Sequence, residues 1–269
     1  MVIALGLFGS LIGSFLNVVI YRVPLGKSIV SPPSACGNCG HEIRPYDNIP
    51  LISWLWLRGK CRDCGTRISA RYPLIELGTA VFFAIVAVVF VPPIVASATP
   101  VAAASAALAL VAFLYLAAIS VALVAIDLDV MRLPNAIVLP AYGVGVVLLG
   151  AASLLTAQGD AALRALIGAL ALGIVYLVLA LAGGMGFGDV KLAGALGLFM
   201  GWLGWEQLIV GWLAGFILGG LFGVALLLAR RARRGTRVPF GPWLIAGAWV
   251  GILLGQPIAH TYLSTLQLS

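Results

Sequence analysis

Long, uninterrupted apolar runs limit what this chain can fold into more than any other feature. A helix that crosses ~30 Å of hydrocarbon needs about 20 apolar residues. Strands are disfavoured because the runs are continuously apolar and do not alternate. The sequence therefore predicts an all-α polytopic membrane protein of about eight transmembrane helices, the sixth of them short, over residues 2–21, 74–92, 102–126, 136–156, 162–182, 190–204, 208–229 and 240–258.

The composition of the whole chain excludes a soluble globular protein. Of the 269 residues, 62% are hydrophobic and 9% are charged, and the mean hydropathy is +1.12. Nine acids and sixteen bases cannot cover a core of this size. A net charge of +7 would also be compatible with binding to nucleic acid. It is better explained by basic residues that orient the chain in the membrane and contact anionic lipid headgroups. We expect membrane lipid and no nucleic acid as a partner.

The positions of Lys and Arg orient the chain, because short loops rich in them stay in the cytoplasm. Of the sixteen bases, all but Arg164 fall in loops on one side, chiefly within residues 22–73 and 230–237. This predicts that both termini lie outside the cytoplasm. The first segment lacks preceding bases and a cleavage pattern, so we expect it to remain as an anchor.

The interval 22–73 is the longest polar stretch, and it contains all four cysteines, as two C-x2-C pairs. Two such turns can complete a tetrahedral zinc shell, and the ligands would be Cys36, Cys39, Cys61 and Cys64. Two disulfides are the alternative, disfavoured by a reducing cytoplasm. His41 could substitute as a ligand or be a plain loop residue. We expect a small module that needs its structural zinc to fold.

Two acidic stretches lie at the ends of apolar runs on the side predicted to be cytoplasmic. AIDLDVMRLPN carries Asp127 and Asp129, and GMGFGDVKL carries Asp189. Carboxylates at membrane depth are costly and usually functional, although Asp189 could also cap the helix that follows it. Capping would not explain the glycines at every second position, which allow a backbone to approach closely; they are Gly184, Gly186 and Gly188.

Two neighbouring aspartates share a proton, which lets one activate water while the other protonates a leaving amine. No serine or cysteine with a partner base competes for this role. The residues alone therefore favour an aspartyl hydrolase at the membrane, with a proton-coupled transporter as the rival. A zinc-bearing assembly subunit without catalysis is a further alternative. A transporter would place its acids near the bilayer midplane, whereas these cluster at one face.

Five blocks in order resemble the type IV prepilin peptidases, the bifunctional leader peptidases and N-methyltransferases of pilus assembly and type II secretion. The blocks are GSFLNVVIYRVP, the cysteine loop from PPSACGNCG to PLIE, IDLDVMRLPN, GMGFGDVKL and VPFGPWL. The resemblance implies that Asp127 and Asp189 form the catalytic pair of a GxGD aspartyl protease. Asp129 and Lys191 would be auxiliary.

The same resemblance implies a location, a substrate and a second reaction. The protein would lie in the bacterial inner membrane and cut the basic leader of a prepilin or pseudopilin after a glycine. It would then methylate the new N-terminal amine with S-adenosylmethionine, whose binding residues we leave unassigned. Asn135 stands where many members have aspartate. We expect three parts: an anchor over 1–21, a zinc module over 22–73 and a seven-helix core over 74–269.

Overall fold

The computed structural model describes residues 1–183, 185–229 and 239–266. Within them every long element of secondary structure is a helix. Gly184 and the arginines at positions 230, 231, 233, 234 and 237 lie outside the described residues. The eight long helices match the eight predicted ones to within a few residues at most ends. They are α1 (Val2–Arg22), α3 (Arg71–Val95), α4 (Pro100–Val130), α5 (Asn135–Leu155), α6 (Gly159–Leu181), α7 (Phe187–Leu203), α8 (Trp205–Leu228) and α9 (Gly241–Thr265).

Seven of these helices are long and apolar enough to span a membrane, one fewer than the eight predicted. The exception is α7, which has 17 residues. Its residues 192–201 are all buried, so α7 is enclosed by other helices over much of its length. A helix surrounded by protein does not need the full apolar length that lipid demands, and α7 packs between α5, α6, α8 and α9.

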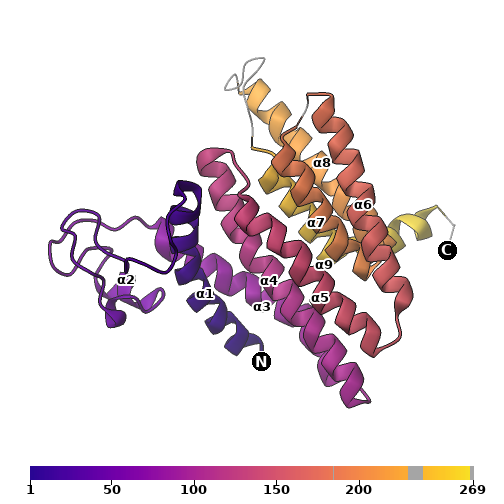
Figure 1. The fold of residues 1–269 in the computed structure, drawn as a ribbon, viewed down its shortest axis with the longest axis horizontal. Helices are drawn as coiled ribbons and strands as arrows, with labels where there is room; N and C mark the ends of the chain where they lie inside the picture. The colour runs from indigo at the N-terminus through magenta and orange to yellow at the C-terminus, as the bar shows by residue number, and fades with distance from the viewer. Residues whose placement is uncertain (184, 230–238, 267–269) are drawn as a thin grey trace.

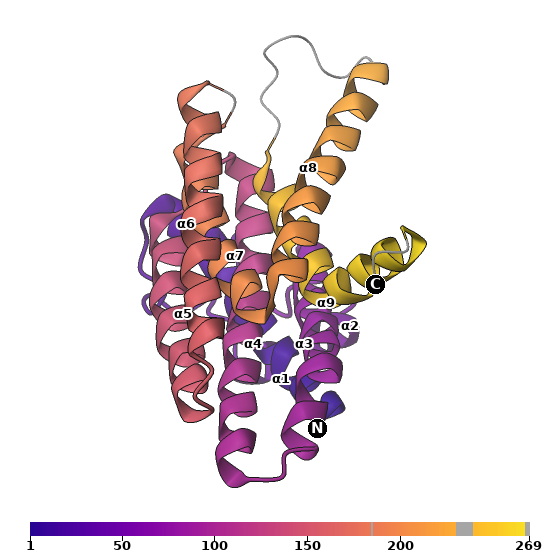
Figure 2. The ribbon, with the colours of Figure 1, turned by 90° about the vertical axis from the view of Figure 1, so that its right-hand side faces the viewer.

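The longest helix, α4, lies at the centre of the bundle. Over its most apolar window, 72% of the residues are buried, against 44% or less in the other candidate spans. Figures 1 and 2 show α4 among the other helices, with α3 on one side and α5 on another. The expected end at residue 126 is too early, because the helix continues to Val130. Asp127 and Asp129 therefore lie within its last turn.

Glycines allow three helix pairs to approach at backbone distance. A Cβ on Gly13 of α1 would lie 2.7 Å from the Cα of Glu76 on α3. A Cβ on Gly201 of α7 would lie 2.5 Å from the carbonyl oxygen of Arg164 on α6. On α9, Gly251 meets the backbone of Gly211 on α8 in the same way. Such small-residue seams drive helix association where lipid removes the hydrophobic effect.

Between α1 and α3 the chain forms a compact loop region with one short helix, α2 (Ile52–Trp56), and two 3-10 turns, Val23–Leu25 and Pro45–Asp47. Figure 1 shows this region projecting beside α1 and α3, on the opposite side of the molecule from α6 and α8. It is tied to the bundle at Glu76 of α3, a buried carboxylate that accepts the N–H of Leu51 at 2.8 Å.

Candidate functional site: an aspartate pocket and a four-cysteine cluster

Asp127 lies in the last turn of α4 and is 5% exposed. Its Oδ2 accepts a hydrogen bond of 3.1 Å from the backbone N–H of Gly241, the first residue of α9. An N–H at a helix start has no partner within its helix and carries partial positive charge. The contact therefore gives a hydrogen-bond partner both to the buried carboxylate of Asp127 and to the free N–H at the start of α9.

Asp189 lies in the first turn of α7, where its Oδ2 accepts the N–H of Gly186 at 3.2 Å. The predicted helix start at residue 190 is too late, because α7 begins at Phe187. Asp189 is therefore not the residue before the helix but the third residue within it, and it contributes to capping by accepting the N–H of the N-cap residue, Gly186. The glycine before it also has a packing reason, since a Cβ on Gly188 would lie 3.2 Å from the Cβ of Leu133. The segment after α4 already occupies part of the room that the glycines create.

Both aspartates line one cavity of about 430 Å³. Its walls come from the turn after α1, the end of α4, the α4–α5 connection and the start of α7. The cavity also includes Gly186 and Gly188, whereas Gly184 lies outside the described residues. Elements from four regions of the sequence therefore bring Asp127 and Asp189 to the same space; the other lining residues are Val23, Pro24, Met131, Arg132, Leu133, Pro134 and Asn135.

The two residues expected to be auxiliary have partners of their own. Asp129 points away from this cavity and forms an ion pair with Arg71, the first residue of α3, with an Nη1–Oδ1 distance of 2.9 Å. Lys191 donates from Nζ to the Oδ1 of Asn135 at 3.0 Å. The amide oxygen of Asn135 therefore accepts the hydrogen bond from Lys191. A carboxylate at this position would accept the same hydrogen bond.

Gly241 is the site residue that sequence reasoning missed. The block VPFGPWL was noticed only as part of a resemblance. A Cβ at position 241 would lie 2.7 Å from the Oδ2 of Asp127, so the close contact requires glycine. The available signal was a Gly-Pro pair at the start of an apolar run, which is typical of a helix beginning.

The four cysteines come from two turns with the same hydrogen-bond pattern. In the first, Gly40 N–H donates to the carbonyl of Cys36, and Cys36 N–H donates to that of His41, both at 2.9 Å. Gly65 N–H and Cys61 N–H repeat these contacts 25 residues later, to Cys61 and Thr66. The glycines that close the turns have φ of 73° and 71°, which favours glycine over other residues.

The sulfur positions fit a metal ion. All four Sγ atoms lie within 4.8 Å of one another, and Cys36 and Cys64 are 3.8 Å apart. A tetrahedral shell with bonds of about 2.3 Å puts its sulfurs ~3.8 Å apart. A hydrogen bond with the Thr66 hydroxyl is the main cause that lowers the pKa of Cys64 to about 6. The pKa of Cys39 is raised to about 12, despite a hydrogen bond from the His41 backbone, because of burial and the neighbouring thiols. His41 contributes its backbone carbonyl to the first turn.

Ion pairs join the two cysteine turns to each other. Arg44, after the first turn, pairs with Asp63 of the second at 2.9 Å. Arg62 of the second turn holds Asp47 through two oxygens, at 3.0 and 2.9 Å from Nε, and this lowers the pKa of Asp47. The second cluster, CRDC, therefore carries both sulfur and the two charges that hold it to Arg44 and Asp47, which follow the first cluster.

The fold and these sites define a class: a multi-pass helical membrane protein with an aspartate pocket at helix ends and a four-cysteine module. The family model described as the type IV leader peptidase family matches residues 113–224. The one described as the bacterial peptidase A24 N-terminal domain matches residues 7–90. The chain belongs to the type IV leader peptidase family and is a peptidase of that bacterial family.

Relatives match over nearly the whole chain. A prepilin leader peptidase/N-methyltransferase of Aeromonas salmonicida is 38% identical, over 97% of this chain and 93% of its own. The protein of the same description from Pseudomonas aeruginosa is also 38% identical, over 96% and 91%. One from Dichelobacter nodosus is 35% identical, over 96% and 93%. No solved structure matches this chain.

Proposed function

We propose that this protein is a membrane aspartyl endopeptidase that removes the leader of type IV prepilins or pseudopilins and then methylates the new N-terminus. The observation that carries the proposal is the single cavity lined by both Asp127 and Asp189. The names of relatives at 38% identity over nearly full length supply the substrate and the second reaction.

In the proposed mechanism the two carboxylates share one proton. The ionised aspartate accepts a proton from water as the oxygen attacks the scissile carbonyl, and the other protonates the leaving amine nitrogen. The N–H groups of Gly241 and Gly186 hold the two carboxylates in place. Gly186 and Gly188 have no side chains to narrow the cavity. An extended substrate could therefore lie with its backbone against this wall.

For the second reaction we infer that the free α-amine of the cut product attacks the methyl group of S-adenosylmethionine. One carbon–nitrogen bond forms, one carbon–sulfur bond breaks, and the amine releases a proton. We leave the donor-binding residues unassigned, with the face that carries the cysteine module as the region in which to search.

We propose that the four-cysteine cluster holds a structural zinc ion and that residues 22–73 form a module distinct from the core at 74–269. Four sulfurs close a tetrahedral shell, so the metal would stabilise the module and take no part in hydrolysis. The basic loops support a position of the module and both aspartates on the cytoplasmic side of the bacterial inner membrane. That is the side on which a prepilin presents its positive leader.

The decisive experiment incubates the purified protein in detergent with a prepilin and follows the mass of the product. We expect wild type to release the leader, and Asp127→Asn and Asp189→Asn each to lose at least ~10³-fold in rate, as expected when a proton-transfer group is removed. Asp160→Asn, an acid in the first turn of α6, is the matched control because it lies outside the pocket, and it should keep the wild-type rate. Full cleavage by either pocket variant would refute the aspartyl mechanism.

Methylation is tested separately, by adding S-adenosylmethionine to the already cleaved product. The expected result is a gain of one methyl group on the N-terminal residue, in wild type and in Asp127→Asn alike, because the aspartate pair serves the first reaction. An unmodified product from wild type would leave the peptidase proposal standing and remove the transferase.

A further inference from the structure

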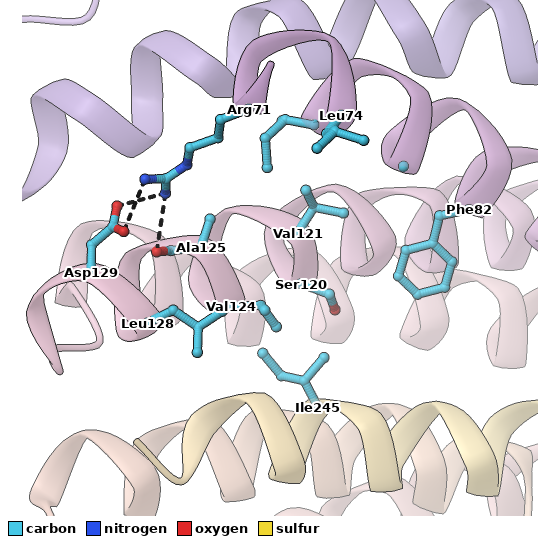
Figure 3. Close-up of a pocket in the computed structure, with 12 residues that line it drawn as sticks. Arg71, Leu74, Phe82, Ser120, Val121, Val124, Ala125, Leu128, Asp129 and Ile245 are labelled. Atoms are coloured by element: carbon cyan, nitrogen blue, oxygen red, sulfur yellow. Dashed lines mark hydrogen bonds and ion pairs between the residues drawn. The ribbon is translucent and has the colours of Figure 1, made fainter. Parts of the chain in front are cut away.

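A second cavity, of about 380 Å³, lies between α3, α4 and α9. Figure 3 shows the ion pair of Arg71 and Asp129 at one end and Phe82 at the other, with Ile245 of α9 facing α4. Its wall runs from Arg71 to Phe82 along α3 and from Asp129 back to Ser120 along α4. We call this cavity the α3–α4–α9 groove. It follows a different face of α4 from Asp127, whose carboxylate contacts the start of α9.

The dimensions of the groove select its occupant. Eleven residues of helix separate Arg71 from Phe82, which is about 16 Å at 1.5 Å per residue. This is close to ~15 Å, half the hydrocarbon thickness of a bilayer. A helix about 10 Å across would fill more than ~1,000 Å³ over that length, which is well above the space in the groove. One extended hydrocarbon chain fits, and a second helix does not.

The lining of the groove agrees with this. Apart from the ion pair and the Ser120 hydroxyl, the lining side chains are apolar. Ser120 is itself engaged, since its Oγ accepts the indole N–H of Trp249 at 3.0 Å. At mid-length Gly78 opens the space, because a Cβ built there meets no atom within 4 Å. The body of the groove therefore offers an occupant only apolar contact.

The mouth of the groove offers two opposite charges at the membrane edge. The side chains of Arg71 and Asp129 are 46% and 41% exposed, so both can contact a group above the groove. A zwitterionic headgroup complements this pair, with its phosphate on the guanidinium and its ammonium on the carboxylate. An anionic headgroup would meet Arg71 favourably but would be repelled by Asp129.

We propose that the α3–α4–α9 groove is a binding site for one phospholipid with a phosphoethanolamine headgroup, seated with a single acyl chain along α3. An acyl chain gains little by leaving other lipid for an apolar groove, since lipid tails are equally apolar. Selectivity therefore rests on the ion pair. The bound lipid would fill the space between α3 and α9, next to the helix end that carries Asp127. The inference does not depend on the proposed function.

The test is native mass spectrometry of the full chain in mild detergent. The protein is incubated with equimolar phosphatidylethanolamine and phosphatidylglycerol that carry the same acyl chains. Wild type should retain one phosphatidylethanolamine, at least fivefold in excess over phosphatidylglycerol. Asp129→Asn should reverse or abolish that preference, because it removes the partner of the ammonium and the repulsion of the anion. Equal retention of both lipids by wild type would overturn the proposal.

A groove-filling variant tests the position of the chain. Gly78→Leu should lower retention at least tenfold, because its side chain enters the space of the acyl chain. Gly143→Leu on α5 is the matched control, since a Cβ there also meets nothing within 4 Å, and it should bind as wild type does. Wild-type retention by Gly78→Leu would contradict the assignment.

If Gly78→Leu does not fold, a photoreactive phosphatidylethanolamine with its diazirine in the acyl chain replaces it in the test. Cross-links on wild type should map to α3 between Leu74 and Phe82 or to α4 between Ser120 and Leu128. Cross-links confined to other helices would reject the site.

Discussion

At the scale of single residues, glycine N–H groups hold both aspartates of the pocket. Gly241 donates to Asp127 and Gly186 donates to Asp189. Backbone donors at helix starts are fixed by the helices themselves, so they orient a carboxylate without adding a competing charge. The two helix starts thus set the positions of the groups that we propose to be catalytic.

The contact at Gly241 gives a sharp prediction. Gly241→Ala puts a Cβ 2.7 Å from the Asp127 oxygen, and the carboxylate must move. A hydrogen bond to a charged group is worth about 1.5–3 kcal/mol, so we expect peptidase activity to fall about ten- to hundredfold. Gly220→Ala, where a Cβ meets nothing within 4 Å, is the control. The rate of leader release, with the melting temperature as a check on folding, decides the result.

The Lys191–Asn135 contact predicts a small gain in stability. Asn135→Asp would turn the 3.0 Å hydrogen bond into an ion pair at an exposed site, worth about 0.2–1 kcal/mol. Thermal unfolding in detergent at low and high salt measures it. Adding Lys191→Met should remove the gain, and a gain that survives this second change would show that the pair is not its source.

These residues differ in how far the sequence could reveal them. Asp127 and Asp189 could be predicted because charge is rare in an apolar chain. The positions of Lys and Arg in the loops predicted that both aspartates lie at the same face of the membrane. Gly241 and Arg71 could not, because their roles arise from contacts across 114 and 58 positions of sequence. Asp129 was expected beside the catalytic pair, yet its partner is the first residue of α3. Periodicity along one helix does not show which neighbour a side chain will meet.

At the scale of elements, the glycine seams explain how a 17-residue helix can be held at a fixed depth. α7 contacts α6 backbone to backbone along Gly197 and Gly201. Both glycines lie in the second half of α7, away from Asp189 in its first turn, so the seam fixes the depth of the helix as a whole. The same seams show why hydropathy placed the helices well but could not show which pairs lie in contact.

A larger side chain in a seam should separate the helices. Gly201→Leu forces atoms into the carbonyl of Arg164, which lies 2.5 Å from a built Cβ. Overpacking of this kind costs about 1–3 kcal/mol, and the melting temperature should fall accordingly. Gly223→Leu on α8, where a Cβ meets nothing within 4 Å, should change it little. Equal effects of the two variants would reject the seam as the cause.

The cysteine module is predicted to hold one zinc ion and to lose its structure without it. Purified protein should contain one zinc per chain by elemental analysis, and Cys36→Ser and Cys64→Ser should each contain much less. A chelator should increase trypsin cleavage within residues 22–73 and leave cleavage elsewhere in the chain unchanged, because the module is too small to fold on its apolar contacts alone. Unchanged zinc in both variants would refute the site.

At the scale of the whole molecule, all the chemistry proposed here lies at one end of the bundle. The aspartate pocket, the Arg71–Asp129 pair and the link from Glu76 to the module use the end of α4, the start of α7 and the start of α3. The apolar pattern and the charge distribution could predict this arrangement. The central position of α4 could not be predicted, because every span is apolar on all sides and its burial depends on which neighbours surround it.

The orientation can be tested with reporter fusions. A periplasm-active phosphatase fused after Ser269 should be active, and the same enzyme inserted in the α4–α5 connection should be inactive, because the basic loops retain that side in the cytoplasm. A fluorescent protein that matures only in the cytoplasm should give the opposite pattern. Phosphatase activity at both sites would contradict the topology.

The glycine seams also have a consequence for biosynthesis. Two of the three seams join helices that are neighbours in sequence, α6 with α7 and α8 with α9, so each pair can close as soon as its second helix leaves the ribosome. The third seam joins α1 to α3, across the whole cysteine module. The first helix must therefore wait in the lipid while the module is made, and its docking onto α3 depends on a loop that forms outside the membrane.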